Sequence, residues 1–159
     1  RFILPKCRVS DPLGGFYPYD FSFSGLKTAM LRQVEKIKSN GKNLPVEDLA
    51  ASFQNIVVQV LVERAVRCAQ DYGLNSVVIV GGVAANKHLR KTMLERTSDS
   101  GITLFLAPRS FCTDNAAMIG AAALIRLESK LIASSLELGI KPRMPLEEAH
   151  LLYQTPPPF

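Results

Sequence analysis

The first candidate binding site in the sequence is the glycine pair Gly81-Gly82. Glycine has no side chain, so a ligand can lie directly against the backbone at such a pair. The pair follows the β-branched run 76–80 and precedes a helical pattern. This order predicts a loop at the carboxyl end of a strand, the usual ligand edge of an open α/β sheet. The spacing matches neither GxGxxG nor GxxxxGK[ST], so a purely structural turn is the alternative.

Asn86 stands at the start of the helical pattern that follows the glycines. Asparagine is favoured at a helix N-terminus, where its side-chain oxygen accepts a backbone N–H. The same amide carries donors and an acceptor, so it could instead reach a ribose hydroxyl or a base edge. The sequence leaves both roles open.

A second candidate site is the segment 112–115, between a second apolar run and the last helical pattern. The carboxylate of Asp114 is a hard oxygen donor, suited to a metal ion or, through one, to the phosphates of ATP. The alternative is a helix cap by Thr113 or Asp114. No histidine lies near Cys112 in the sequence, which favours a buried thiol over a nucleophile.

The third candidate is the segment 20–28, in which Lys27 falls in the first turn of a predicted helix. A cation at that position opposes the helix dipole unless an anion lies nearby. A lysine that bends into solvent is the alternative, and the sequence leaves the roles of Ser22 and Ser24 open.

Secondary-structure elements predicted from the apolar spacing must position these residues. Helices are expected from the cap residues 22–25 to about 38, and at about 45–72, 86–97 and 114–129; buried parallel strands, apolar on both faces, are expected at 76–80 and 102–106. Residues 1–20 are expected to be an extended, poorly regular lead-in. Small residues in the last helix would let it pack closely against a sheet. Because neighbouring parallel strands end at one edge, Gly81-Gly82 and Asp114 are expected to share one opening.

Two strands alone do not make a stable sheet, and parallel strands need both faces covered. The predicted elements would leave apolar faces uncovered, and the chain opens on Arg1 without an initiator methionine. We therefore expect an α/β fold truncated at its amino-terminal side, with the missing strands upstream of Arg1. Within it we expect a lead-in and helix over 1–44, an α-β-α-β-α nucleotide-binding lobe over 45–130 and a tail over 131–159.

The 159 residues are 47% apolar and 21% charged, which is typical of a globular protein. The longest apolar run, 77–85, is too short to cross a membrane. Three scattered cysteines favour a reducing compartment over secretion. His88 and His150 are far apart and lack the spacing of metal ligands.

The net charge of +5 resides in residues 1–42, which hold eight basic and three acidic side chains. Such a stretch can bind nucleic acid through its phosphates. An ordinary solvated face is the alternative for so modest an excess. The sequence shows no arginine-rich run and no aromatic residues interleaved with the basic ones, as a stacking platform would need.

Three segments, in order, resemble signature segments of the TsaD family: Asp20-Phe-Ser-Phe-Ser-Gly-Leu-Lys-Thr-Ala29, Val78-Ile-Val-Gly-Gly-Val-Ala-Ala-Asn86 and Cys112-Thr-Asp-Asn-Ala-Ala-Met-Ile-Gly120. Three ordered segments are specific where one would be weak, and the resemblance extends over about residues 1–130. The insert 14–19 is similar to that of cyanobacterial or plastid members. The family comprises tRNA N6-adenosine threonylcarbamoyltransferases, once described as O-sialoglycoprotein endopeptidases.

The resemblance implies a two-lobed actin-like, Hsp70-like ATPase fold of the ribonuclease H-like class, of which this chain is the carboxyl-terminal half. It implies transfer of the threonylcarbamoyl group from threonylcarbamoyl-AMP to N6 of adenosine 37 in tRNAs that read ANN codons. By the match of motifs, Asn86 would contact the adenylate and Gly81 and Gly82 would lie beside its adenosine. Lys27 would belong to the substrate-binding surface, and Asp114 would complete a site for Fe²⁺ or Zn²⁺.

The resemblance also implies partners and a compartment. These are tRNA, a TsaB-like paralogue, a TsaE-like ATPase and a TsaC-like synthase that supplies threonylcarbamoyl-AMP, with no membrane involved. The expected location is the cytoplasm or, in a eukaryote, the plastid stroma or mitochondrion. The basic residues Lys27, Arg32 and Lys36 would then face the anticodon arm of the tRNA.

The departure from the family pattern concerns the metal. The family's other two metal ligands form a His-x-x-x-His pair in the amino-terminal half, which also carries a glycine-rich phosphate loop, and this sequence contains neither. One carboxylate cannot hold a catalytic metal that normally takes three protein ligands. We therefore expect the parent protein to be an acyltransferase and this fragment alone to be inactive.

Two other functions are weighed against this one. The first is a non-catalytic fragment or scaffold of the same fold that binds nucleotide or partner proteins only. The second is a different actin-fold member, such as a carbamoyltransferase or a sugar kinase, and the segment 20–28 argues against it.

Overall fold

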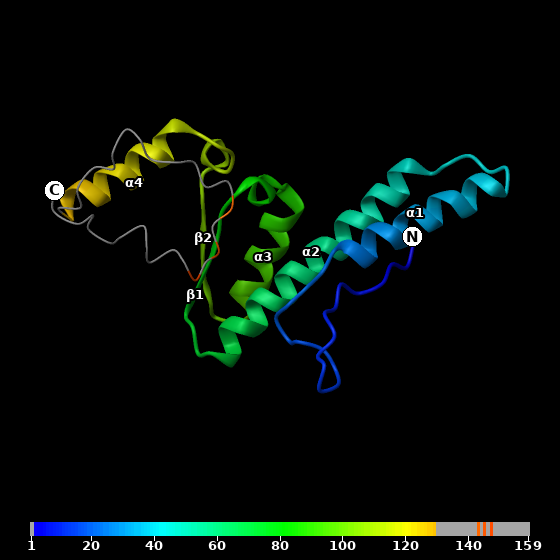
Figure 1. Cartoon of the computed structure of the whole chain (residues 1–159), viewed down its shortest axis with the longest axis horizontal. Helices are drawn as coiled ribbons and strands as arrows, with labels where there is room; N and C mark the ends of the chain where they lie inside the picture. The colour runs from blue at the N-terminus through cyan, green and yellow to red at the C-terminus, as the bar shows by residue number, and fades with distance from the viewer. Residues whose placement is uncertain (1, 130–142, 144, 146, 148–159) are drawn as a thin grey trace. The chain divides into compact units, whose positions relative to one another are not determined.

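The computed structural model describes residues 2–129, 143, 145 and 147. The chain divides into two compact units, residues 1–112 and 113–159. The elements of the first unit are α1 (Ser24–Ser39), α2 (Val46–Asp71), β1 (Ser76–Ile79), α3 (Lys87–Asp99) and β2 (Thr103–Leu106), and the second contains α4 (Ala116–Glu128) (Figure 1). The mixed α/β order predicted from the sequence is confirmed, and the bounds agree to within a few residues.

Strands β1 and β2 are adjacent and parallel. The register pairs Ser76 with Thr103 and Ile79 with Leu106. Pairing continues one residue further, because the N–H of Ala107 donates to the carbonyl of Ile79 at 3.3 Å. The segments that follow the two strands therefore leave the sheet from the same end, which confirms that part of the prediction.

The core of the first unit lies between α2, α3 and the strand pair (Figure 1). Helix α2 contributes one buried valine per turn, which is the spacing that keeps side chains on one face of a helix. The core residues from α2, from α3 and from the strand pair are Val58, Val62, Val66, Leu89, Met93, Val77, Ile79 and Leu104. This packing fixes α3 and both strands against α2.

By length and composition alone, α2 could cross a membrane. The core helix of a globular unit passes the same test when its apolar face is buried by neighbouring elements. In this structure Val58, Val62 and Val66 of α2 are all at most 3% exposed within the core. The apolar face of α2 is therefore explained by its packing.

One face of the strand pair is uncovered. Val78, Val80 and Phe105 are 62%, 68% and 55% exposed. Successive side chains of a strand point to opposite faces, and α2 and α3 cover only the face that carries Val77, Ile79 and Leu104. The prediction that both strands are buried on both faces is therefore wrong for this chain, whereas the expected uncovered apolar face is present.

Helix α4 of the second unit has no buried residue. Close packing of this helix against a sheet was predicted from its small residues, which are Ala116, Ala117, Gly120 and Ala121. Its larger apolar side chains are exposed as well, with Ile119 at 63%. The predicted tail 131–159 falls outside the described residues except at positions 143, 145 and 147.

The lead-in contains a tight hairpin rather than an extended segment. Ser10 and Phe16 form an isolated antiparallel bridge, and the N–H of Tyr17 donates to the carbonyl of Val9 at 3.0 Å. The turn uses a glycine pair, residues 14–15, with φ angles of 105° and 84°, which other residues adopt only at a cost. The prediction of an irregular segment without named strands holds, but its extended course is corrected by this hairpin.

Cys7 anchors the lead-in to the helices. It is 3% exposed and packs with Leu26 of α1 and Val60 of α2 in a second buried cluster. Burial raises the pKa of the Cys7 thiol, and the positive charge of Arg64 acts in the opposite direction. The lead-in, α1 and α2 therefore pack together in this apolar cluster.

Candidate functional site

Gly81 and Gly82 form an exposed turn directly after β1. Gly81 has φ 84° and ψ 174°, a backbone conformation essentially restricted to glycine. Gly82 opens a short 3₁₀ turn, Gly82–Ala85. A methyl group on either glycine would meet no other atom within 4 Å. The backbone therefore has open space beside it, and the predicted bare turn at the carboxyl end of a strand is confirmed, whereas its contact with a ligand stays a prediction.

Asn86 caps α3. Its Oδ1 accepts the N–H of Leu89 at 3.0 Å, and its Nδ2 donates to Oε1 of Gln54 on α2 at 3.0 Å. Of the two roles left open by the sequence, the cap is the one observed. A side-chain amide nitrogen carries two N–H groups, so Nδ2 retains one donor beyond its bond to Gln54. Contact with an adenylate through that donor stays a prediction.

Arg90 of α3 connects the two segments that leave the strand pair. Its Nε donates to the carbonyl of Ala84, in the turn after β1, and its Nη2 donates to the carbonyl of Ala107, directly after β2. The same Nη2 lies 3.2 Å from Sγ of Cys112. One half-buried guanidinium therefore holds the glycine turn and the segment 107–112 at a common edge.

Cys112 serves as a packing residue. It is 2% exposed, and its thiol lies 3.7 Å and 3.5 Å from the carbonyl oxygens of Ala107 and Pro108. The expected burial of the Cys112 thiol is confirmed, and its lack of a nucleophilic role stays a prediction.

Little in the sequence indicated the role of Arg90. Its carbonyl partners lie 6 and 17 residues away along the chain, and they become neighbours only when β1, α3 and β2 have packed. One signal was present: Arg90 follows Asn86 by four positions, so both lie on the same face of α3. Because Asn86 begins the helix at the carboxyl end of β1, that face points to the end of the strand pair.

In the second unit, Asn115 caps α4. Its Oδ1 accepts the N–H of Met118 at 2.9 Å, and its Nδ2 donates to the carbonyl of Thr113 at 2.9 Å. The alternative weighed for this segment, a cap by Thr113 or Asp114, is contradicted. The helix begins at Ala116, so Asn115 occupies the position from which a side-chain oxygen reaches the third helical N–H.

Asp114 is exposed and does not cap the helix. A carboxylate in this state suits a hard divalent cation, so it can supply one ligand. Among the residues that the structure describes, no three His, Cys, Asp or Glu side chains gather into a possible metal site. The residues of this region alone therefore do not make the three-ligand set of a catalytic metal. His88 lies against Asn55, with Nε2 and Oδ1 3.5 Å apart, and His150 falls outside the described residues.

Lys27 lies in the first turn of α1, as predicted, and is exposed. The helix has no side-chain cap, and Oγ of Ser22 accepts the N–H of Ser24 at 3.4 Å, so Ser22 shapes the turn before the helix. Ser22 and Ser24 also line a pocket of about 480 Å³ with Arg32 and residues of the lead-in, and Lys27 is outside that lining.

Arg90 holds the turn 81–86 and the segment 107–112 together, so it reaches the second predicted site only at Cys112. The third predicted site also approaches the first, because Phe21 lines a pocket of about 400 Å³ with Val80 and Val83, which flank the glycine pair. The start of α1 packs on the lead-in through Leu26. Asp114 belongs to the second unit, and its place in one opening with Gly81-Gly82 stays a prediction.

These features define a mixed α/β unit with a bare backbone turn at the carboxyl end of parallel strands. Comparison with known proteins gives the family: residues 2–121 match "TsaD: tRNA N6-adenosine threonylcarbamoyltransferase". The chain belongs to the TsaD family, whose members have the ribonuclease H-like, actin-like ATPase fold. The resemblance seen in the sequence is confirmed.

The relatives carry the same description. The chain is 64% identical, over all 159 residues, to the tRNA N6-adenosine threonylcarbamoyltransferase of Prochlorococcus marinus strain NATL2A. It is 58% identical over 159 residues to that of strain CCMP1986 / NIES-2087 / MED4. In both comparisons the whole chain aligns with 45% of the relative's length.

Proposed function

We propose that this chain is the adenylate-binding half of an enzyme that transfers the threonylcarbamoyl group from threonylcarbamoyl-AMP to N6 of adenosine 37 in tRNAs reading ANN codons. The observation that carries the proposal is membership of the TsaD family, with relatives of that description at 58% to 64% identity. Because the chain spans 45% of their length, the remaining parts of the reaction would belong to sequence that those relatives carry in addition.

The glycine turn would receive the adenosine of the substrate. The open space beside Gly81 and Gly82 allows a ribose or base to approach the backbone closely. The remaining N–H of the Asn86 amide is a donor for such a ligand. Arg90 would contribute by holding Ala84, and with it the turn, in a fixed position relative to β2.

The reaction itself would be an acyl transfer. The N6 amine of adenosine forms a bond to the carbamoyl carbon, the bond between that carbon and the phosphate oxygen breaks, AMP leaves, and the amine loses a proton. A bound divalent metal, Fe²⁺ or Zn²⁺, would act as a Lewis acid that orients phosphate or carbamoyl oxygens. This chain would supply Asp114 as one ligand and would position the adenylate for attack, which lowers the entropic cost of the reaction.

The proposed partners follow from the same family. They are tRNA, a TsaB-like paralogue, a TsaE-like ATPase and a TsaC-like synthase that makes threonylcarbamoyl-AMP, in the cytoplasm or in an organelle stroma or matrix. Lys27, Arg32 and Lys36 of α1 are all exposed and would face the anticodon arm. Lys27 would belong to this surface and not to the glycine turn.

A scaffold without catalysis is the second candidate function. The observation that favours it is the uncovered apolar face formed by Val78, Val80 and Phe105, which can bind another polypeptide without any chemistry. The two candidates differ in whether Asp114 matters. A scaffold needs the apolar face and not an exposed carboxylate.

The test is the content of threonylcarbamoyladenosine in tRNA, measured by mass spectrometry. A strain lacking its own enzyme receives the full reading frame that contains this chain, the 159-residue chain alone, or the full reading frame with Asp114→Ala. Of these three, we expect modification only with the unaltered full frame. Asp99→Ala, an exposed aspartate on α3, is the matched control and should retain modification. Full modification with Asp114→Ala would overturn the proposed metal role and favour the scaffold.

A further inference from the structure

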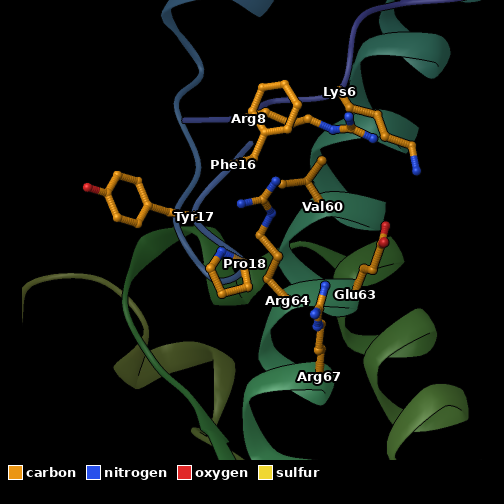
Figure 2. Close-up of a pocket in the computed structure, with 9 residues that line it drawn as sticks. All are labelled: Lys6, Arg8, Phe16, Tyr17, Pro18, Val60, Glu63, Arg64 and Arg67. Atoms are coloured by element: carbon orange, nitrogen blue, oxygen red, sulfur yellow. The ribbon is translucent and has the colours of Figure 1, made fainter. Parts of the chain in front are cut away.

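A basic pocket of about 280 Å³ lies between the lead-in hairpin and α2, and its lining does not include the glycine turn (Figure 2). Lys6 and Arg8 line it from the lead-in, on either side of Cys7, which is buried. The chain turns tightly there, because the N–H of Arg8 donates to the carbonyl of Lys6 at 3.0 Å. Arg64 and Arg67 reach it from α2, where spacings of three and four residues share one face. The packing of Cys7 on Val60 therefore brings four cations together.

The charge of this pocket is positive on balance. Its lining holds Lys6, Arg8, Arg64 and Arg67 and a single acid, Glu63. Arg67 is also paired with Asp71, with Nε and Oδ2 3.3 Å apart. Among the described residues the lining thus leaves an excess of cations, which would attract an anion in spite of the Glu63 carboxylate.

Arg64 shows that the pocket is not merely a solvated surface. Its Nη1 is buried, and the described part of the chain offers it no hydrogen-bond partner. Figure 2 shows the side chain extending from α2 toward the hairpin. A buried donor without a partner is costly, and a guanidinium presents a planar fork of N–H groups that fits the oxygens of a phosphate.

The ring of Phe16 lies beside these cations, and Tyr17 follows it on the hairpin. The guanidinium of Arg8 sits over the ring of Phe16, 4.8 Å from its centroid, which holds Arg8 at the pocket rim. Tyr17 is 38% exposed and points to the other side of the hairpin from Arg64 (Figure 2). Cations next to exposed rings are the combination with which proteins bind unpaired nucleotides, through the phosphate and the base face respectively.

We infer that this pocket binds a backbone phosphate of RNA, with Arg64 as the central ligand and Lys6 and Arg8 at its rim. The inference deepens the proposed function and rests on it for the choice of tRNA as the RNA. The lining of this pocket does not include the glycine turn, but Arg64 also lines a neighbouring pocket with Val80 and Val83, which flank that turn. Arg64 and Arg67 would add two residues from outside the basic stretch 1–42 to the tRNA-binding surface that the sequence placed on α1.

The test measures tRNA binding by the chain as a function of salt. The probe is an unmodified tRNA transcript that reads an ANN codon, and the variants are Arg64→Gln and Arg8→Gln. We expect Arg64→Gln to weaken binding on the order of tenfold and to reduce the slope of log affinity against log salt by about 0.7 to 1, the value for one lost phosphate contact. Unchanged affinity and slope in both variants would overturn the inference.

The controls separate the pocket from general charge and from folding. Arg96→Gln removes the same charge from an exposed position on α3 and should leave binding nearly unchanged; an equal loss with Arg96→Gln would mean a non-specific charge effect. Arg64→Gln removes a buried donor without a partner, so its thermal midpoint should not fall. If Arg64→Gln does unfold the protein, the test uses Arg8→Gln, at an exposed position. Unchanged tRNA affinity and salt slope in that variant would then overturn the inference.

The source of the anion is distinguished by competition. Inorganic phosphate at concentrations that saturate the pocket should displace tRNA weakly, and poly-glutamate should not displace it. Displacement by poly-glutamate that depends on Arg64 would identify an acidic protein as the partner and overturn the assignment to RNA. If modification activity does not depend on Asp114 but tRNA binding depends on Arg64, the proposed metal role fails and this inference stands. If tRNA binding does not depend on Arg64 but modification activity depends on Asp114, this inference fails and the proposed function stands.

Discussion

Nη2 of Arg90 lies 3.2 Å from Sγ of Cys112, across 22 residues of chain. The same nitrogen donates to the carbonyl of Ala107, and Nε of the same guanidinium donates to the carbonyl of Ala84. Because Ala84 follows β1 and Ala107 follows β2, one side chain sets the separation of the two loops at the carboxyl ends of the strands. The geometry of the candidate site therefore depends on a residue that would itself touch no substrate.

Replacing Arg90 with methionine should destabilise the first unit by about 1.5 to 3 kcal/mol, because partly buried carbonyls lose a charged donor. The measurement is urea unfolding followed by circular dichroism. Arg96→Met on the exposed side of α3 is the control and should change the free energy of unfolding by no more than about 0.5 kcal/mol. Equal effects of the two substitutions would show that Arg90 acts only as a helix residue.

The two glycines should respond differently to alanine. Gly81→Ala should cost about 1 to 3 kcal/mol of stability, because φ 84° with ψ 174° strains any residue with a Cβ. Gly82→Ala should change stability by less than about 1 kcal/mol, since its φ is not positive and the added methyl meets open space. It should nevertheless weaken binding of an adenylate to the full-length protein, measured by calorimetry. Undiminished adenylate binding by Gly82→Ala would remove the turn from the site.

The cap of α4 allows the structural role of Asn115 to be distinguished from the proposed metal-binding role of Asp114. Asn115→Ala should destabilise the helix by about 1 kcal/mol and speed hydrogen exchange at the Met118 amide, whose N–H bonds to Asn115. Asn115→Ser should retain most of the protection, because serine also caps. Asp114→Ala should leave the exchange unchanged. Faster exchange in Asp114→Ala would mean that Asp114 supports the helix and not only a metal.

The phenol of Tyr19 should lose its proton at a higher pH than an ordinary tyrosine. Its O–H donates to Oδ2 of Asp71 at 2.9 Å, and this hydrogen bond, with burial and the Asp71 charge as smaller causes, raises the pKa of Tyr19. The bond needs the neutral phenol, so its contribution to stability is complete below the ordinary tyrosine pKa of about 10 and is lost as pH rises through the higher folded value. The tyrosinate absorbance that disappears in Tyr19→Phe reports this group.

Asp71→Asn supplies the check on that assignment. It removes the carboxylate that holds the phenol neutral, so the absorbance change assigned to Tyr19 should move to lower pH. Tyr17→Phe, which changes a tyrosine on the neighbouring hairpin, should leave that transition in place. A titration unaffected by Asp71→Asn would contradict the hydrogen bond as the cause.

The sequence was a good guide to features that depend on neighbours along the chain. The apolar periodicity predicted α2 and α3, the β-branched run predicted β1, and the positive-φ turn followed from Gly81. It was a poor guide at helix ends and faces. The start of α4 was predicted at Asp114 because aspartate and threonine cap well, but asparagine caps equally well, and only the backbone course shows that Asn115 holds the position.

The predicted burial of both faces of β1 and β2 failed for a related reason. An apolar run indicates which side chains favour burial, but not whether another element lies over them. In this chain α2 and α3 cover one face, and Val78 and Phe105 remain exposed on the other. The apolar runs of β1 and β2 are thus typical of strands in a sheet covered on both faces, whereas in this chain only one face is covered.

The order of helices and strands, the bare glycine turn and the family could all be predicted from the sequence alone. Those properties follow from side-chain spacing and backbone freedom within a few residues. The tertiary structure decided that Arg90 joins two loops and that Arg64 and Arg67 meet Lys6 and Arg8 in one pocket. These partners are separated along the chain, and only the packing of helices and strands against one another brings the carbonyls to Arg90 and the four cations to the lining of one pocket.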